Sequence, residues 1–332
     1  GRPLQNPEAA VLASAADTMM PVLPPLSAGR VRGPRLVAGA PILGGAYRLL
    51  ADHGGSAAAR LWQAREMSTG NVVALTIMDP AVLGGHKGRD ETASRTRSNA
   101  SRAQAKAQIL RRANLLASLD TPGMAKIHSV VDGGSLVLVI SEWIHGSPLD
   151  AVAESGPDPL AAGYAVADLA DAAADAANVG SPMGLDHRDR VRINTHGSAV
   201  LAFPGALPEN SVRQDAHGVA TALGLLLRNV PDEEIPDELA REYFRLRELT
   251  RNKSEELNLR EAARTLRRLT TGELAIHEFS RLSAHRAISW LDALDQEHQV
   301  AQETIDRLRE IIGEPPADLE DRAPIVARPG DA

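Results

Sequence analysis

The sequence predicts an α+β fold with two lobes, a small antiparallel β-sheet followed by a mostly helical part. Short β-branched runs separated by turns fill much of residues 46–140. Residues 158–269 instead carry apolar side chains at helical spacing. A hairpin pattern, Val191–Asn194 and Ser198–Phe203 around a turn that contains Gly197, lies inside the helical part. Runs of strands followed by runs of helices are typical of α+β proteins.

Composition narrows the class of protein. The 332 residues are enough for two lobes with flanking segments. The formal charge of −7 argues against nucleic acid as the main partner. The chain has no Cys, which excludes disulfides and thiolate metal sites. No apolar run is long enough to cross a bilayer.

The elements follow in order. The first lobe is predicted to hold strands at Tyr47–Leu50, Ala58–Ala64, Asn71–Met78, Met124–Val130 and Ser135–Ile140, with a helix over Ala100–Leu119. The second lobe is predicted to begin with an Ala-rich helix over Asp158–Val179 and to continue, beyond the hairpin, with a helix over Asp215–Leu227 and further helices to Leu269.

The stretch Ser181–Pro204 resembles the catalytic loop and following hairpin of a protein kinase. His187-Arg188-Asp189 with Asn194 matches the H-R-D-x-x-x-x-N signature literally. That match puts Asn194 inside the predicted hairpin, too close to Ala202 for a loop and two strands. We therefore interpret it as accidental, because a short motif counts only in its structural context.

If the predicted hairpin is instead aligned with the hairpin of a kinase, the catalytic positions carry other residues. Leu185 then stands at the catalytic Asp, Arg190 at the metal-binding Asn and Ala202 at the Asp of D-F-G. Without a carboxylate at Ala202, we expect no metal site. His187 and His196 are expected to be solvated surface residues rather than metal ligands.

The first lobe resembles a kinase N-lobe in which the nucleotide-binding residues are also replaced. Gly54, Ser56 and Ala59 stand where the Gly-rich loop has three glycines, and a Cβ there crowds a phosphate. Thr76 stands at the phosphate-binding Lys, and Arg112 at the Glu that pairs with it. We expect no cofactor, although the hinge at Ser141–Leu149 could still accept a base. Lys106 is the alternative phosphate ligand.

The activation segment is almost missing. Only Gly205–Gln214 separates the end of the hairpin from the helix that begins at Asp215, which resembles the family helix with Asp at this position. A kinase without this segment has little surface on which to place a substrate hydroxyl in line. The degenerate positions together predict a catalytically inactive pseudokinase.

The resemblance extends to one kind of pseudokinase. Segments over residues 33–37, 47–50, 61–64, 73–76, 79–80, 142–144 and 186–193 are similar to the mycobacterial-type MurJ (MviN) pseudokinase domain. In that family the domain is fused to the lipid II flippase of peptidoglycan synthesis. The resemblance implies a phosphorylation-dependent regulatory scaffold at the cytoplasmic face of the plasma membrane. This chain, which begins at Gly1, would be a soluble piece of a membrane-tethered parent protein.

The resemblance also implies two protein partners. A Ser/Thr protein kinase phosphorylates a Thr, and a forkhead-associated (FHA) domain protein binds the phosphothreonine. The resemblance ends near Leu269, so the phosphorylated residue cannot be carried over. Thr270, Thr271 and Thr304 are candidates by position, and Thr18 lies in the predicted N-terminal linker.

Five segments are predicted: a disordered linker over 1–36, an N-lobe over 37–145, a C-lobe with a truncated activation segment over 146–269, a helical extension over 270–313 and a disordered tail over 314–332. Two alternatives stay open. The chain could be an atypical kinase with Asp186 or Asp189 as base, or a nucleotide sensor that depends on the hinge.

Overall fold

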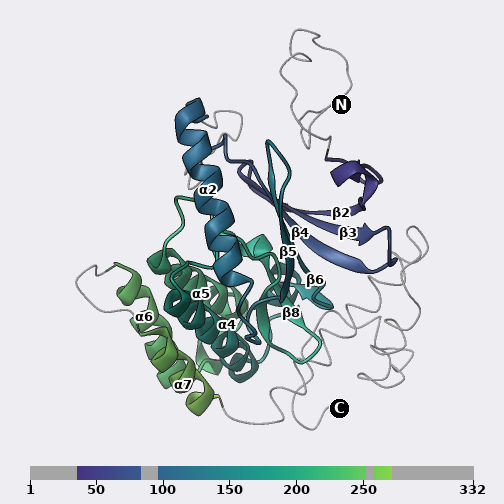
Figure 1. Ribbon diagram of the computed structural model, residues 1–332. Coiled ribbons are helices and arrows are strands. Elements are labelled where there is room, and N and C mark those ends of the chain that lie inside the picture. The colour runs from purple at the N-terminus through teal and green to yellow at the C-terminus, as the bar shows by residue number, and fades with distance from the viewer. Residues whose placement is uncertain (1–35, 84–95, 252–257, 271–332) are drawn as a thin grey trace, which may run out of the picture.

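The computed structural model describes residues 36–83, 96–251 and 258–270. In this part of the chain the polypeptide forms two lobes, a curled sheet with one long helix and a helical lobe below it (Figure 1). Most of the predicted linker, most of the predicted helical extension, the whole predicted tail, Thr271 and Thr304 lie outside the described residues. No helix of the described ranges is long and apolar enough to span a membrane.

The N-lobe sheet has six antiparallel strands in the order β1-β2-β3-β4-β6-β5. They are β1 (Pro41–Ile42), β2 (Tyr47–Gly55), β3 (Ala59–Glu66), β4 (Val72–Met78), β5 (Ile127–Asp132) and β6 (Val137–Glu142), with a short helix η1 (Leu43–Gly45) after β1. The predicted strands are present, while β1 and η1 were not predicted. Helix α2 (Asn99–Leu116) packs against β5 and β6.

Alternation along the strands gives the sheet two different faces. On the outer face, Trp62, Leu75 and Ile140 belong to one buried apolar cluster. The inner face presents Leu61 and Ala74 toward the C-lobe, where they join a second cluster. The outer face of the N-lobe sheet is therefore apolar, whereas the inner face combines apolar side chains with the buried polar residues Gln63, Thr76 and Ser141.

The C-lobe is built around α4 (Pro159–Val179). Asp158 caps its start by accepting from the amides of Leu160 and Ala161. Its many buried Ala side chains allow close packing of α5 (Val212–Leu227) and α7 (Leu259–Leu269). The remaining helices are α3 (Leu149–Glu154), η4 (Asp232–Glu234) and α6 (Asp237–Arg251).

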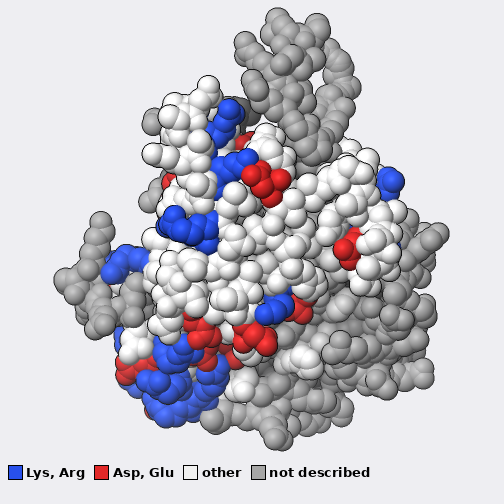
Figure 2. Space-filling model, in the orientation of Figure 1, with Lys and Arg blue, Asp and Glu red and all other residues white. Residues whose placement is uncertain are grey.

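Ion pairs also hold α7 on α4. Arg260 contacts Asp171 at 3.0 Å, and Arg267 contacts Asp168 at 2.6 Å. Figure 2 shows basic side chains next to acidic ones at the lower end of this lobe. Arg260 and Arg267 therefore have carboxylate partners within the protein.

A small sheet connects the hinge to the predicted hairpin. It has the order β7-β8-β9, with β7 at Gly146–Pro148, β8 at Val191–Asn194 and β9 at Ala199–Leu201. The turn η3 (Arg188–Arg190) leads into β8. The hairpin agrees with the prediction, but β7 and α3 were not predicted. Gly146 adopts φ +149°, and a Cβ there would lie 1.8 Å from the carbonyl oxygen of Ile193.

Candidate functional site between the lobes

An aromatic and apolar cluster fills the space between the N-lobe sheet and the hairpin. Leu61, Ala74, Trp143, Ala202 and Phe203 are all buried in it. The ring centroid of His53 lies 5.1 Å from that of Trp143 and 5.7 Å from that of Phe203. Burial, with a smaller contribution from the charge of Arg192, lowers the pKa of His53 to about 3. This part of the interlobe region therefore holds a neutral imidazole.

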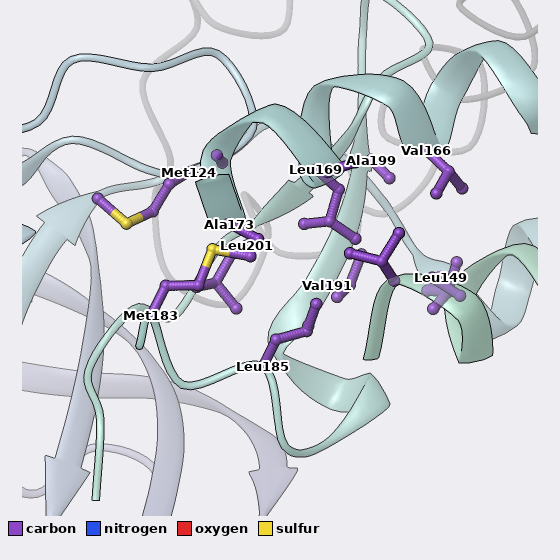
Figure 3. Packing of buried hydrophobic residues seen from close by; sticks show 14 of the residues in the cluster. Met124, Leu149, Val166, Leu169, Ala173, Met183, Leu185, Val191, Ala199 and Leu201 are labelled. Carbon is purple, nitrogen blue, oxygen red and sulfur yellow. The ribbon is translucent and has the colours of Figure 1, made fainter. Parts of the chain in front are cut away.

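The loop before η3 is fixed by Asp215 at the start of α5. Its two carboxylate oxygens accept from the amides of Met183 at 2.8 Å and Leu185 at 3.0 Å. Burial raises the pKa of Asp215 to about 7, although these two hydrogen bonds oppose the rise. The side chain of Leu185 is buried in the C-lobe core beside Leu149 and Val191 (Figure 3). The residue predicted at the catalytic Asp thus contributes to packing.

Arg190 is the most deeply buried cation of this loop. Its side chain is 1 % exposed, and its Nε lies 2.8 Å from Oδ1 of Asp186. Its Nη1 donates to the carbonyl oxygens of Phe203 at 3.1 Å and Gly205 at 2.6 Å. Asn210 also donates to Asp186, at 3.1 Å. Arg190 therefore ties the loop to the segment that follows β9.

These residues do not fit Mg²⁺, the metal that protein kinases hold in this region. Mg²⁺ needs oxygen ligands in near-octahedral geometry, whereas Arg190 supplies a positive guanidinium and Ala202 a methyl group. The nearby carboxylate of Asp186 is already paired with Arg190. Within the described ranges, no three His, Asp or Glu side chains form a group that could hold a metal ion.

Arg192 on β8 binds the hinge. Its Nε donates to the carbonyl oxygen of Ile144 at 2.9 Å, and its Nη2 donates to that of Gly146 at 3.0 Å. The guanidinium also lies over the Trp143 ring, 4.6 Å from the centroid. Burial lowers the pKa of Arg192 to about 9. The expected base-accepting hinge therefore has two carbonyls already occupied by a protein side chain.

The loop at the end of β2 also has its amides engaged. The amide of Gly54 donates to Asp52 at 2.8 Å, and that of Gly55 donates to Asp189 at 3.2 Å. The amides of Ser56 and Ala59 bond each other's carbonyl oxygens across a tight turn. These are the amides that a Gly-rich loop would direct at phosphate. In this structure, each of the four has an internal acceptor.

The two positions predicted for the Lys–Glu ion pair are not brought together. Thr76 is buried on β4, and its Oγ1 has no hydrogen-bond partner among the described residues. Arg112 on α2 donates instead to the carbonyl oxygen of Leu207 at 2.7 Å. Lys106, the alternative phosphate ligand, pairs with Asp132 at 2.7 Å.

The residues that match the kinase catalytic-loop signature literally, and the neighbouring Asp186, have other structural roles. Asn194 ends β8, where its Oδ1 accepts from the amides of His196 and Ser198 in the turn. Asp189 accepts from Gly55, and Asp186 from Arg190 and Asn210. Both carboxylates considered as a catalytic base therefore already have protein partners.

Thr270 is a poor phosphorylation candidate in this conformation. It is fully buried, and its hydroxyl donates to the carbonyl oxygen of Leu266. A Cβ added at Gly163 would lie 2.5 Å from its Cγ2, so Thr270 packs directly against α4. A kinase would have to displace this residue before it could modify it.

Sequence reasoning missed Arg192 as a site residue. One signal was present, because Arg192 stands between Val191 and Ile193 in a short strand that is buried on both faces. A charged side chain in such a strand needs an internal partner. Its targets, the hinge carbonyls, could not be identified without the tertiary structure.

The two lobes, their hinge and the interlobe loops define a protein-kinase-like fold. No family model matches the chain. The structure is similar to the kinase domain of Mycobacterium tuberculosis PknI in a double-mutant form, with a TM-score of 0.51 and 15% sequence identity over 71% of this chain and 100% of that chain. Another structure of the PknI kinase domain aligns with a TM-score of 0.49 and 16% identity, over 70% of this chain and 98% of that chain.

Proposed function

We propose that this chain is a pseudokinase, a protein-kinase-like domain that does not transfer phosphate and acts as a regulatory scaffold. The observation that carries the proposal is the placement of Arg190. Its buried guanidinium binds Asp186 and two backbone carbonyls in the region where a kinase holds Mg²⁺. A metal-nucleotide complex brought there would meet a fixed positive charge in place of oxygen ligands.

The other parts of the site support the same proposal. Phosphoryl transfer depends on positioning and on charges that stabilise the transferred group. Thr76 supplies no positive charge to the phosphates, and Leu185 supplies no carboxylate to a substrate hydroxyl. Only ten residues, 202–211, connect β9 to α5, which leaves little room for a segment that holds a substrate. These losses all weaken the same chemical step.

For the scaffold role, we propose regulation of peptidoglycan precursor (lipid II) export. The proposal depends on the resemblance of short segments, which include residues 73–76 and 186–193, to the mycobacterial-type MurJ pseudokinase domain. A Ser/Thr protein kinase would phosphorylate a Thr of this chain, and an FHA-domain protein would bind it. Burial of Thr270 leaves Thr271, Thr304 and Thr18 as the better candidates.

Thermal unfolding with and without excess Mg-ATP tests the loss of nucleotide chemistry. A ligand at about a hundred times its Kd stabilises the folded state by roughly 2.7 kcal/mol. In a domain of this size that free energy raises Tm by roughly 5–11 °C. We expect no shift at millimolar Mg-ATP. A clear shift together with ADP production would contradict the proposal and favour the atypical-kinase alternative, and a shift alone would favour the nucleotide sensor.

A binding experiment tests the scaffold role separately. The chain is phosphorylated by a mycobacterial Ser/Thr kinase and passed over an immobilised FHA domain. We expect retention of the phosphorylated chain only, and loss of retention when Thr271, Thr304 and Thr18 are replaced together by Ala. Thr270→Ser is the control, because it keeps a hydroxyl at the buried position. Retention without phosphorylation, or retention of the triple variant, would count against this mode of binding.

A further inference from the structure

We propose that Asp189, Arg190 and Arg192 act as internal ligands that hold the two lobes closed in the absence of nucleotide. The inference rests on the proposed loss of catalysis, because it assigns a role to the side chains that replace the catalytic ones. Each of the three lies where a kinase would bind one part of its metal-nucleotide complex. Each also has charge or hydrogen-bonding chemistry suited to that place.

Asp189 occupies the place of a phosphate. Its Oδ2 accepts from the amide of Gly55 at 3.2 Å, a contact between residues 134 positions apart that joins η3 to the end of β2. The contact is close, because a Cβ at Gly54 would lie 2.3 Å from the same oxygen. A carboxylate and a phosphate are both anionic acceptors for loop amides. Asp189 thus binds the N-lobe loop from the C-lobe side.

Arg190 occupies the place of the metal. It binds the carbonyl oxygens of Phe203 and Gly205 in the segment after β9. That segment lies directly beneath the N-lobe sheet, since a Cβ at Gly205 would meet Met78 at 2.9 Å and Val139 at 3.4 Å. A cation supplied by the protein therefore fixes the segment on which the inner face of the sheet rests.

Arg192 occupies the place of the base. Its planar guanidinium stacks on Trp143 and donates to the hinge carbonyls of Ile144 and Gly146. A purine ring is bound in a similar way, by stacking on an apolar or aromatic surface and by hydrogen bonds in the plane of the ring. Because Arg192 lies on β8 and its acceptors lie in the connection between the lobes, the interaction fixes the hinge to the C-lobe.

Asp189 connects the C-lobe to the N-lobe loop, and Arg192 connects it to the hinge. Arg190 acts within the C-lobe, where it fixes the segment on which the N-lobe sheet rests. In a nucleotide-binding protein these contacts depend on the ligand, so the lobe arrangement changes with occupancy. In this protein the groups that make these contacts are side chains of the chain itself. The molecule therefore presents one fixed lobe arrangement to a partner, whatever the nucleotide concentration.

Distance measurements on the full chain test this inference. The sequence contains no Cys, so Met67→Cys in the N-lobe and Arg228→Cys in the C-lobe, both exposed, accept spin labels without background. We expect a narrow label-to-label distance distribution that Mg-ATP does not change. Asp189→Ala should broaden it, and should speed exchange of the Gly55 amide by roughly ten- to a hundredfold, as expected for a lost charge-assisted hydrogen bond.

Asp52→Ala is the matched control. Asp52 bonds the amide of Gly54 from within the same loop and does not cross to the other lobe in that contact. Its loss should leave the distance distribution and Gly55 exchange as in the parent. Equal behaviour of the Asp189→Ala and Asp52→Ala variants would overturn the inference. The pseudokinase proposal would survive that result, because it fails only if the parent chain binds Mg-ATP and produces ADP.

Discussion

The Nε of Arg190 lies 2.8 Å from the Oδ1 of Asp186, inside a loop where Arg190 is 1 % exposed. The ion pair is extended by hydrogen bonds from Arg190 to Phe203 and Gly205 and from Asn210 to Asp186. Desolvation can offset the attraction within a buried ion pair, but removing one member leaves an uncompensated buried charge. The stability of this region is therefore expected to depend on Arg190, the residue that we propose stands at the metal-binding position.

The first prediction is that Arg190→Met strongly destabilises the fold. The substitution leaves Asp186 and two buried carbonyl oxygens without their donor, which typically costs about 3–5 kcal/mol. Urea unfolding at neutral pH measures it. Arg188→Met is the control, because Arg188 is half exposed and its 3.3 Å pair with Asp150 should be worth about 1 kcal/mol or less. Similar losses in both variants would show that the Arg190 contacts contribute little.

The second prediction concerns acid pH and His53. Its pKa is about 3 in the folded protein, against an ordinary value near 6.5. Between these values the unfolded chain binds a proton that the folded chain does not, so stability falls as the pH falls from about 6.5 toward 3. Between pH 7.5 and 5.5 the loss from this one group is about 1.4 kcal/mol.

His53→Phe checks the effect, because Phe keeps a ring against Trp143 and Phe203 but cannot be protonated. Unfolding free energies are compared at pH 7.5 and 5.5, and the variant should lose about 1.4 kcal/mol less than the parent. His196→Gln controls for removal of a histidine, since His196 is exposed in the hairpin turn. Parallel pH profiles for parent and His53→Phe would contradict a buried neutral imidazole.

Much of the fold follows from local patterns in the sequence. The strands β2 to β6, helices α2 and α4 and the β8–β9 hairpin have strong apolar periodicity, and they lie within a few residues of the predicted positions. Helix α5 begins at Val212 rather than Asp215, because Ser211 caps it by accepting from the amide of Gln214. The three-residue strand β7 has too short a pattern to predict, since pairing with β8 determines it.

The candidate site could be located from the sequence, but its contacts could not be. Register along the hairpin predicts that Arg190 and Ala202 stand at the positions of kinase metal ligands. Nothing local shows that Arg190 binds carbonyls 13 and 15 residues away, or that Asp189 reaches Gly55 across 134 residues. Such contacts depend on how the lobes close, which is a property of the whole packed chain.

The third prediction is that Gly218→Ala destabilises the protein although Ala favours a helix by about 1 kcal/mol. A Cβ at this α5 position would lie 2.4 Å from Cγ and 2.6 Å from the backbone oxygen of Leu185. The backbone there is held by Asp215 and cannot easily move. We expect a net loss of about 1–3 kcal/mol by urea unfolding, as for other overpacked sites.

Gly224→Ala, also in α5, is the matched control for Gly218→Ala. A Cβ at Gly224 would meet the Oη of Tyr243 at 2.7 Å, near the end of a side chain that can shift. Gly224→Ala should therefore cost less than Gly218→Ala. The reverse order would mean that the loop at Leu185 yields more readily than its hydrogen bonds indicate.

The fourth prediction concerns Arg112, the residue that stands at the ion-pair Glu position. It donates from α2 to the carbonyl oxygens of Leu207 at 2.7 Å and Asn210 at 3.4 Å, and so holds the short segment between β9 and α5. In Arg112→Met this segment should open locally, because its hydrogen bonds from Arg112 are lost, although the Arg97–Glu209 ion pair still holds Glu209. Exchange of the Leu207 amide, which donates to Oδ1 of Asn210, should rise by about tenfold or more.

Arg111→Met is the control, since the neighbouring Arg111 is exposed. If Leu207 keeps the same protection in both variants, the segment is held by its own turn and not by α2.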